Sequence, residues 1–349
     1  MGENFKEHME RLEGFHAGRE LKNFNSKIVL DCANGVGAKT MNEILKRVDF
    51  TKYVQFELIN DSELEFLNAQ CGAEYVQKDQ LVPRSWNHPD QKCVAFDGDA
   101  DRQVYYYQDA QGAFRCLDGD KQFALVMKYV SGLLAELDLT DSISSVLVQT
   151  AYCNGRCTAY LQENKIHHEL VKTGVKNAHP VVQKYDIGAN DEPNGHGTVV
   201  TKFDKIKPLL EGKENKQACE RLLGVLGIFN QYVGDSIANM LAIETILYDL
   251  DMSIQQFAEL YSENPSKLWK AVVPDRLVFV PNFNETRLEA PKHMQDKIDE
   301  LVAAAAESKA FVRPSGTEDV VRIYAEAKTV EEMNQMGEAM AAYIAANFK

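Results

Sequence analysis

The sequence predicts an α/β protein made of consecutive α/β domains with mixed sheets, followed by a C-terminal α+β domain. Short apolar runs of strand type recur along most of the chain and alternate with stretches of helical periodicity, which is typical of layered α/β folds. At 349 residues the chain has room for two or three domains of about 150 residues each. Changes of pattern place the predicted domains at residues 1–140, 141–262 and 263–349.

The first predicted domain begins with a polar helix over residues 1–20. A strand, a glycine turn and a helix follow, and the turn contains Gly35 and Gly37 but lacks the third glycine of a dinucleotide fingerprint. We therefore interpret it as a structural turn. The remaining expected elements, in order, are strand Lys27–Leu30, helix Ala38–Arg47, strand Tyr53–Ile59, a polar stretch to Asp90, strands Tyr105–Gln108 and Phe114–Leu117 around a hairpin turn, and a helix across Phe123–Leu134.

The other two predicted domains differ in their order of elements. The second alternates strands and helices, whereas the last brings a strand, a helix, a polar loop, a strand and a final amphipathic helix. The expected elements of the second domain are strand Ser145–Val148, a helix led by residues 177–179, strand Asp186–Ala189, and helices Leu222–Phe229 and Ser236–Leu250. Those of the last domain are strand Ala271–Val273, helix Pro291–Ala305, strand Val320–Ala327 and a helix from Val330 onward.

Composition and charge restrict the classes of partner. Hydrophobic residues make up 45% and charged residues 26% of the chain, as in an ordinary globular protein. The formal net charge of −14 argues against nucleic acids and anionic membranes, which attract basic surfaces. No run approaches the roughly 20 apolar residues of a membrane helix. We expect a cytoplasmic protein in which a local basic pocket binds any anionic substrate.

Three aspartates on alternate residues form the strongest local signal. Asp97, Asp99 and Asp101 are separated by the small residues Gly98 and Ala100, so the backbone can direct three carboxylates at one point. Three acidic ligands leave an octahedral Mg²⁺ open positions for water or a phosphate oxygen, which suits phosphoryl transfer. Arg102 follows as a planar donor for such a phosphate.

Two alternatives compete with this magnesium site. An EF-hand loop shares the spacing but needs Gly at its sixth and Glu at its twelfth position, where this chain has Arg102 and Gln108. That alternative is rejected. A solvated acidic turn is the other, and the apolar runs Cys93–Phe96 and Val104–Tyr107 on either side argue against it, because acid packed between strands needs a compensating charge.

A second loop has the residue types of a phosphate site. Arg313, Ser315, Gly316 and Thr317 offer a guanidinium, two hydroxyls and a bare backbone that an oxyanion can approach. Arg322 alternates with apolar neighbours on the next strand and should therefore face the loop. The alternative is a capped turn with a surface ion pair, but converging arginines and hydroxyls favour phosphate.

Further polar residues are less specific by themselves. Glu192, Asn194 and His196 alternate along a Gly-rich loop and could hold vicinal sugar hydroxyls, although an ordinary polar turn explains them equally well. Lys176 and His179 stand near a helix start, where such side chains are usually solvated. Their interpretation depends on the loops around them.

Taken together, these loops resemble the α-D-phosphohexomutase superfamily, and within it the phosphoacetylglucosamine mutases most closely. The resemblance runs in order over nearly the whole chain and rests on Phe96–Arg102, Thr173–Lys176, Glu192–Gly197 and Arg313–Asp319. The wording Asn-Gly-His-Gly resembles the acetylglucosamine branch, since the glucose and mannose branches tend to have Ser at the position of Asn194.

The resemblance implies roles for the residues named above. It implies Mg²⁺ at Asp97, Asp99 and Asp101, and a phosphorylated amino sugar as ligand. Its hydroxyls would contact Glu192, Asn194 and His196, and its non-transferred phosphate Arg313, Ser315, Gly316, Thr317 and Arg322. Arg102 would offset charge on the transferred group, and Lys176 or His179 would act as acid or base. The three predicted domains would then bind metal, sugar and phosphate in that order along the chain.

The resemblance also implies a phosphoserine that this sequence does not contain. Family members have an N-terminal domain whose Ser-His-Asn loop donates the phosphoryl group, and no Ser-His-Asn occurs in the 349 residues. We therefore expect interconversion of N-acetylglucosamine 6-phosphate and 1-phosphate only together with such a domain, for example one encoded separately. The alternatives are a non-catalytic phosphosugar-binding or regulatory protein and a glucose or mannose phosphate specificity. A phosphatase is disfavoured because no separate aspartate nucleophile precedes the aspartate cluster.

Overall fold

The structure is a computed structural model that describes residues 1–62, 64–316 and 318–348. None of the described helices is both long and apolar enough to cross a membrane. The elements are α1 Gly2–Phe15, β1 Lys27–Asp31, α2 Val36–Arg47, β2 Gln55–Ile59, α3 Gly72–Asp79, β3 Cys93–Phe96, β4 Gln103–Gln108, β5 Phe114–Leu117, α4 Gly119–Glu136, β6 Ser145–Thr150, α5 Gly155–Glu163, β7 His168–Val171, α6 Val175–Val182, β8 Ile187–Asp191, β9 Gly197–Thr201, α7 Phe203–Leu210, α8 Lys216–Ile228, α9 Ser236–Leu250, α10 Ile254–Ala258, β10 Ser266–Val272, the 3₁₀ turn η1 Arg276–Val278, β11 Val280–Pro281, β12 Leu288–Ala290, α11 Lys292–Ala304, β13 Lys309–Pro314, β14 Val320–Glu326 and α12 Val330–Asn347.

The chain separates into two compact units that are described one at a time. The first unit comprises Met1–Leu147 and Val181–Leu260, and the second comprises Val148–Pro180 and Tyr261–Lys349. The fold is mixed α/β, as predicted. The division into domains 1–140, 141–262 and 263–349 stays a prediction.

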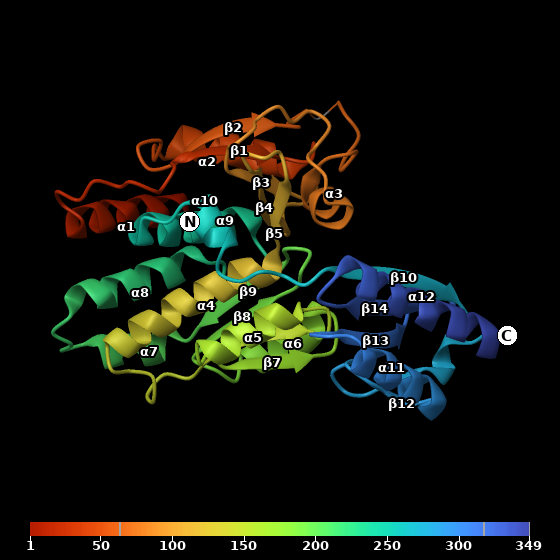
Figure 1. Cartoon of the computed structure of the whole chain (residues 1–349). Coiled ribbons are helices and arrows are strands. Elements are labelled where there is room, and N and C mark those ends of the chain that lie inside the picture. Colours follow the sequence, from red (N-terminus) through yellow and green to blue (C-terminus); the bar gives the residue numbers. More distant parts are fainter. Residues whose placement is uncertain (63, 317, 349) are drawn as a thin grey trace. The chain divides into compact units, whose positions relative to one another are not determined.

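The first unit contains a five-stranded mixed sheet in the order β2-β1-β3-β4-β5. The strands β1, β2 and β3 are parallel, whereas β4 and β5 are antiparallel additions (Figure 1). All four residues of β3 are buried, because this strand lies in the middle of the sheet and both of its faces are covered. The acidic loop joins the end of β3 to the start of β4, at the edge where the parallel strands end.

A layer of helices lies against this sheet within the first unit, with α1, α4, α8 and α9 packed on one another (Figure 1). The helix α9 is buried almost all round, which explains its continuous apolar sequence. The ring of His8 in α1 is 2% exposed and lies against Gly224, where no Cβ would fit. Burial lowers the pKa of His8 to about 4; the nearby Asp249 acts in the opposite direction, whereas Arg11 and Arg221 lower the pKa further.

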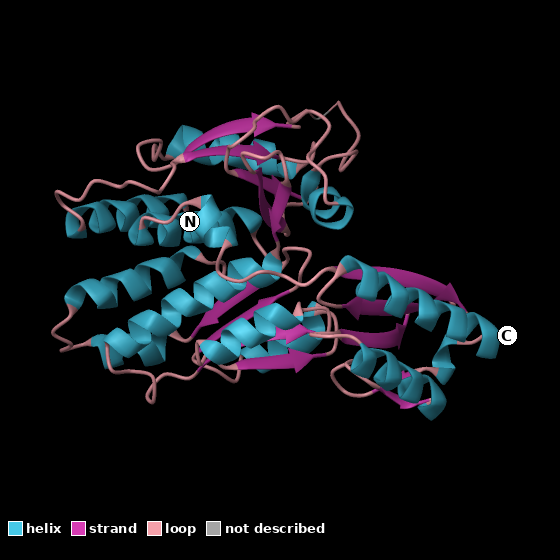
Figure 2. Ribbon diagram, in the orientation of Figure 1, coloured by secondary structure: helices cyan, strands magenta, loops and turns pink. Residues whose placement is uncertain are grey.

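The second unit contains an antiparallel sheet in the order β10-β14-β13, with α11 and α12 packed on one face (Figure 2). The core face includes Val312, Val321 and Ile323, all fully buried. Arg322 lies between two of these residues and therefore points to the opposite face, as the alternation predicted. The C-terminal part is thus an α+β arrangement.

Most predicted elements are present, with shifted ends. The stretch before Asp90 was expected to be polar loop, yet it contains α3, which buries only Gly72, Ala73 and Val76 and therefore has a weak apolar signal. Strand β9 was not predicted either. Helix α6 begins at Val175, two residues before the predicted start at Asn177.

Candidate functional site

The three aspartates form one cluster of carboxylates. One oxygen from each of Asp97, Asp99 and Asp101 lies within 4.8 Å of the other two. The turn is closed by the Asp97 carboxylate, whose Oδ1 accepts hydrogen bonds from the backbone N–H groups of Asp101 and Arg102, both at 3.1 Å. Ala100 has φ of 58°, in the left-handed region that few non-glycine residues adopt. The three predicted carboxylates therefore converge on one point, and their role as metal ligands stays a prediction.

The electrostatics of the cluster fit a divalent cation. Burial raises the pKa of Asp97 to about 6, and the neighbouring carboxylates of Asp101 and Asp99 act in the same direction. The Oδ1 atom of Asp101 is buried and accepts no hydrogen bond from a described residue. Three converging carboxylate oxygens, together with the buried Asp101 Oδ1 atom, suit Mg²⁺. This cation binds carboxylates together with water and substrate phosphates.

Arg102 lies over the carboxylates that precede it. Its Nε is 3.7 Å from Asp97 Oδ2 and 3.6 Å from Asp101 Oδ1, and it donates no hydrogen bond to a described residue. Glu74, on the unpredicted helix α3, lies 3.9 Å from the Arg102 guanidinium. The Arg102 side chain as a whole is about one-third exposed, although its Nε atom is buried, so part of it remains accessible to an incoming oxyanion.

The glycine turn before α2 packs its backbone against the acidic loop. Val36 donates its backbone N–H to the carbonyl of Gly98 at 3.0 Å. A Cβ on Gly35 would lie 2.2 Å from that same carbonyl oxygen, so only glycine allows the two backbones to approach. The turn is structural, as expected, and its contribution is to hold the aspartate loop in place.

The Glu192–Gly197 loop joins β8 to β9 and meets the acidic loop within the first unit. Gln103 donates its backbone N–H to the carbonyl of Gly195 at 3.2 Å, and Arg102 and His196 form an isolated β-bridge. The Nε2 atom of His196 lies 3.7 Å from Asp101 Oδ2. Residues almost 100 positions apart therefore form one polar surface, which their sequence separation alone did not reveal.

Within this loop the predicted sugar-binding residues form hydrogen bonds with one another. Asn194 donates its side-chain amide to Glu192 Oε2 at 3.1 Å and accepts the backbone N–H of His196 at 3.0 Å. The ring of His196 is largely buried, and its Nδ1 atom has no hydrogen-bond partner among the described residues. An acceptor, an amide and an imidazole fixed side by side can bind adjacent hydroxyl groups.

The predicted phosphate residues gather in the second unit. Arg313 and Arg322 are direct cross-strand neighbours on β13 and β14, and Ser315 and Gly316 follow at the turn between these strands. Ser315 is nearly buried, and its backbone N–H bonds to Val320. Gly316 has open space where a Cβ would stand, so its backbone is accessible. Thr317 lies outside the described residues.

Two residues that the sequence did not reveal hold Arg313. Its Nε donates to the hydroxyl of Tyr152 at 2.8 Å, and the guanidinium lies 5.3 Å from the centre of that ring. Glu285, only 3% exposed, is 3.7 Å from the other side of the guanidinium. The same carboxylate accepts the backbone N–H and the hydroxyl of Thr173 at 3.0 and 2.7 Å. The Thr173 turn and the phosphate loop are therefore joined.

Lys176 and His179 lie on α6 of the same unit, just after the Thr173 turn. Lys176 is exposed and His179 is half-buried. The link through Glu285 fixes the turn that precedes Lys176. Their acid or base role stays a prediction.

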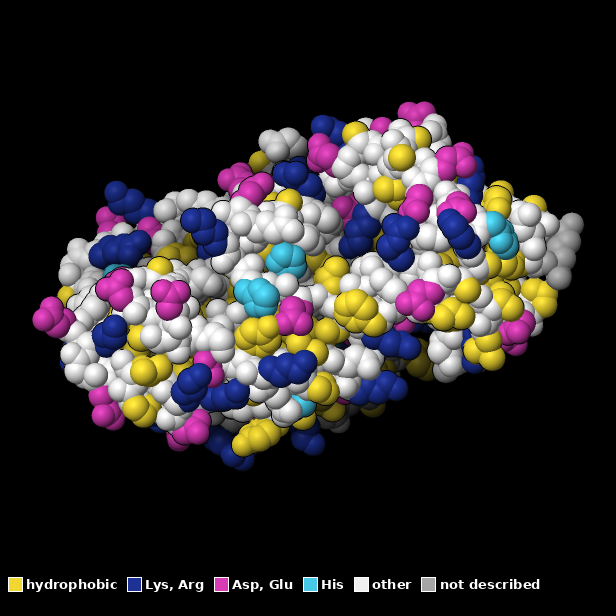
Figure 3. Space-filling view, turned by 90° about the horizontal axis from the view of Figure 1, so that it is seen from below, with side chains coloured by type: hydrophobic (Ala, Val, Ile, Leu, Met, Phe, Trp, Pro, Cys, Tyr) yellow, Lys and Arg dark blue, Asp and Glu magenta, His cyan; other side chains and the backbone are white. Residues whose placement is uncertain are grey.

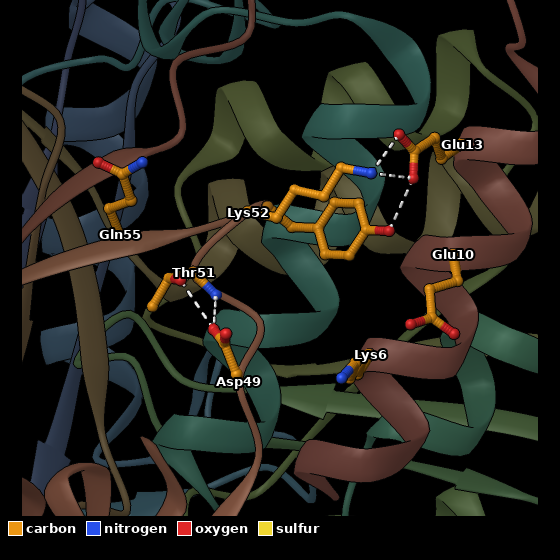
Figure 4. A pocket seen from close by; sticks show the side chains of 8 residues that line it. Lys6, Glu10, Glu13, Asp49, Thr51, Lys52 and Gln55 are labelled. Atoms are coloured by element: carbon orange, nitrogen blue, oxygen red, sulfur yellow. Dashed lines mark hydrogen bonds and ion pairs between the residues drawn. The ribbon is translucent and has the colours of Figure 1, made fainter. Parts of the chain in front are cut away.

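One hollow in the first unit has a different chemistry. Lys6, Glu10, Glu13 and Asp49 line it together with Lys52 and neighbouring residues (Figure 4). Its charges pair locally, since Lys52 lies 2.6 Å from Glu13 and this contact lowers the pKa of the glutamate. None of the predicted site residues lines it. Lysines and arginines are interspersed with acids in the same way over the face seen in Figure 3.

Three family profiles match the chain. Phosphoacetylglucosamine mutase AMG1, domain II, matches residues 12–104, and domain III of the same protein matches residues 118–252. The C-terminal domain of phosphoglucomutase/phosphomannomutase matches residues 278–342.

Curated relatives are similar over most of the chain. The chain is 41% identical to human phosphoacetylglucosamine mutase over 88% of its own length and 57% of the relative. It is 40% identical to the Saccharomyces cerevisiae enzyme of that name, over 92% of its length and 60% of the relative. The chain thus spans about three fifths of the length of these relatives.

A solved structure is similar over almost the entire chain. The Aspergillus fumigatus N-acetylphosphoglucosamine mutase, in complex with GlcNAc-6P and magnesium, superposes with a TM-score of 0.90 at 32% identity. The match covers 98% of this chain and 69% of that one. A substrate complex of N-acetylglucosamine-phosphate mutase, described as a member of the α-D-phosphohexomutase superfamily, also gives a TM-score of 0.90 at 36% identity.

Proposed function

Because the chain belongs to the phosphoacetylglucosamine mutase family, we propose that it binds N-acetylglucosamine phosphates together with Mg²⁺ and takes part in interconverting the 6-phosphate and the 1-phosphate. The observation that carries this proposal is the meeting of the aspartate cluster with the Glu192–Gly197 loop, where His196 lies 3.7 Å from Asp101. A metal site beside a set of hydroxyl-binding groups suits phosphoryl transfer to a sugar. Relatives of the acetylglucosamine type favour that sugar over glucose or mannose.

Each predicted residue has a role in this proposal. Asp97, Asp99 and Asp101 would hold Mg²⁺, which when bound supplies positive charge next to a phosphoryl group. Arg102 donates to the oxygens of the transferred group, where charge stabilisation contributes most. The remaining contacts divide into sugar-binding residues, which are Glu192, Asn194 and His196, and residues for the non-transferred phosphate, which are Arg313, Ser315, Gly316, Thr317 and Arg322.

The reaction also needs a phosphoryl carrier. In the family scheme a phosphoserine gives its phosphoryl group to the free sugar hydroxyl, whose proton passes to a base for which Lys176 and His179 are the candidates. The bisphosphate then reorients, and its other phosphoryl group returns to the serine. Ser315 is unsuited as carrier, because it belongs to the loop for the non-transferred phosphate. We therefore propose that the carrier belongs to an N-terminal domain that acts with these residues, in the cytoplasm.

A binding experiment tests the site independently of turnover. Arg313→Ala should weaken N-acetylglucosamine 6-phosphate binding by on the order of 1.5 to 3 kcal/mol, because charge-assisted hydrogen bonds are lost. Unphosphorylated N-acetylglucosamine should bind as before. Arg287→Ala is the matched control, since Arg287 is an exposed arginine of the same unit that pairs with Asp299 at 2.7 Å. Equal losses for both sugars would mean that this loop does not recognise phosphate.

A coupled mutase assay tests the carrier. The 349-residue protein alone, primed with a sugar bisphosphate, should turn over several orders of magnitude more slowly than a mixture that contains a relative's N-terminal domain, since a covalent mechanism without its nucleophile retains little activity. Robust turnover by the protein alone would reveal a carrier within it. No turnover in the mixture, with phosphosugar binding intact, would favour a binding or regulatory protein.

A further inference from the structure

Three basic side chains form a row across the sheet of the second unit. Arg322 on the central strand β14 is directly opposite Arg313 on β13 and directly opposite Lys270 on β10. Residues directly opposite in antiparallel strands project to the same face of a sheet. The row therefore spans all three strands, on the face away from the helices α11 and α12.

The charges in this row are unevenly compensated. Arg313 has the buried carboxylate of Glu285 at 3.7 Å. Arg322 and Lys270, in contrast, have no ion-pair partner among the described residues, and the buried Nε of Arg322 donates no hydrogen bond to any of them. Like charges directly opposite each other destabilise a sheet. A buried donor without an acceptor adds to that cost, so an anion bound to the row would stabilise it.

The missing charge matches one phosphate group. A phosphate monoester carries about −1.5 to −2 charges at neutral pH, and the two uncompensated cations of the row supply the complement. Neighbouring strands are about 4.8 Å apart, so Lys270 stands one strand from Arg322 and two strands from Arg313. A flexible lysine at the end of the row suits a point-charge contact, whereas the arginines supply directed donors.

We propose that Lys270 is a further phosphate-binding residue, which completes a site formed with Arg322 and Arg313. The proposal rests on the proposed function, because it assigns another residue to the phosphate site of the same sugar ligand. It differs from the loop motif, which ends on β14 and includes nothing from β10. Lys270 thus extends the site to the far edge of the sheet.

Lys267 provides a control on the same strand. It is an exposed lysine three residues before Lys270, and its partner Ala325 is fully buried on the core face. Its Nζ lies 5.2 Å from the centre of the Trp269 ring, which also belongs to that face. Replacing Lys267 therefore removes a positive charge from the same strand and leaves Lys270, Arg322 and Arg313 unchanged.

The test is calorimetric titration of the 349-residue protein with N-acetylglucosamine 6-phosphate and with inorganic phosphate. We expect Lys270→Ala to raise both dissociation constants by about tenfold, Lys270→Arg to retain most of the affinity, and Lys267→Ala to change them by less than about twofold. Thermal unfolding of each variant establishes that it is folded.

The outcomes separate this inference from the proposed function. If Arg313→Ala weakens phosphosugar binding and Lys270→Ala behaves like Lys267→Ala, Lys270 is not part of the site while the proposed function stands. If the wild-type protein binds neither phosphate nor the phosphosugar, both are overturned. A loss of affinity with Lys270→Ala that Lys270→Arg restores supports a charge contact at this position.

Discussion

Asp99→Asn should stabilise the protein when divalent cations are absent and make it the less stable form at saturating Mg²⁺. Without a cation the three carboxylates repel one another, and Asp99 is the most exposed of them. Its replacement by the isosteric amide removes one charge and leaves the backbone hydrogen bonds of Asp97 untouched. The same replacement removes one of three proposed metal ligands. Its effect on the free energy of unfolding should therefore have opposite signs without a divalent cation and at saturating Mg²⁺.

The geometry sets the magnitudes. Unit charges at the 4.8 Å limit of the cluster repel by about 0.9 kcal/mol per pair in a water-like dielectric. Asp99 takes part in two of the three pairs, so the amide should raise the free energy of unfolding by about 2 kcal/mol at low ionic strength. A cation present at ten times its dissociation constant stabilises the folded wild type by about 1.4 kcal/mol, which is less than the gain from the amide. At a hundred times its dissociation constant it contributes about 2.7 kcal/mol, which exceeds that gain, so the order of stability reverses only near saturation.

Urea unfolding in EDTA and in excess MgCl₂ measures both effects, and titration calorimetry measures binding directly. Asp79→Asn is the control, because Asp79 is an exposed aspartate outside the cluster, at the end of α3. The control should show the same gain from Mg²⁺ as the wild type. Equal gains from Mg²⁺ in Asp99→Asn and the wild type would refute metal binding by this loop. A destabilised Asp99→Asn in EDTA would refute the repulsion argument.

Two further perturbations test the support of the site and of the helical layer. Gly35→Ala should reduce Mg²⁺ affinity and cost on the order of 2 kcal/mol of stability, because its Cβ would lie 2.2 Å from the carbonyl oxygen of Gly98. Gly14→Ala, with nothing within 4 Å, is the control, and calorimetry compares the two; unchanged affinity in Gly35→Ala would show that the turn does not support the loop. For His8, burial lowers the pKa from 6.5 to about 4, so its neutral form is favoured by folding. The resulting stability is complete above pH 6.5 and declines as the pH falls, by about 2 kcal/mol at pH 5. Unfolding of His8→Phe should lack this decline, and parallel pH profiles would contradict the assignment.

Local sequence was sufficient for the parts of the site that one loop contains. Asp97, Asp99 and Asp101 converge because they alternate along one tight turn, and Arg322 faces away from the core because side chains alternate along a β strand. The strands were predictable for a similar reason, since continuous apolar runs mark buried strands such as β3. Helix α3 was missed because only a narrow side of it is buried, and the carboxylate of Glu74 near Arg102 was missed with it.

What local sequence did not reveal is pairing between distant segments. Tyr152 and Glu285 hold Arg313 from 161 and 28 positions away, and no residue near either one marks that contact. Lys270 illustrates the same limit, because its face depends on the register between β10 and β14. A shift of one residue would place Lys270 on the core side and Ala271 in the row.

The proposed binding residues therefore fall into two groups that respond differently to mutation. Side chains such as Asp99 and Lys270 are exposed, and their removal should change binding more than folding. The contacts between loops depend instead on close approach of two backbones, as between Gln103 and Gly195. Gly195 has φ of 90°, and a Cβ added to it would lie 1.9 Å from the carbonyl oxygen of Gln103. Because no L side chain fits there, a substitution at Gly195 should separate the Glu192–Gly197 loop from the aspartate loop and reduce affinity for Mg²⁺ and for the proposed sugar ligand together. A variant that loses affinity for one of these ligands alone identifies a contact residue. A variant that loses affinity for both identifies a residue that holds the two loops together.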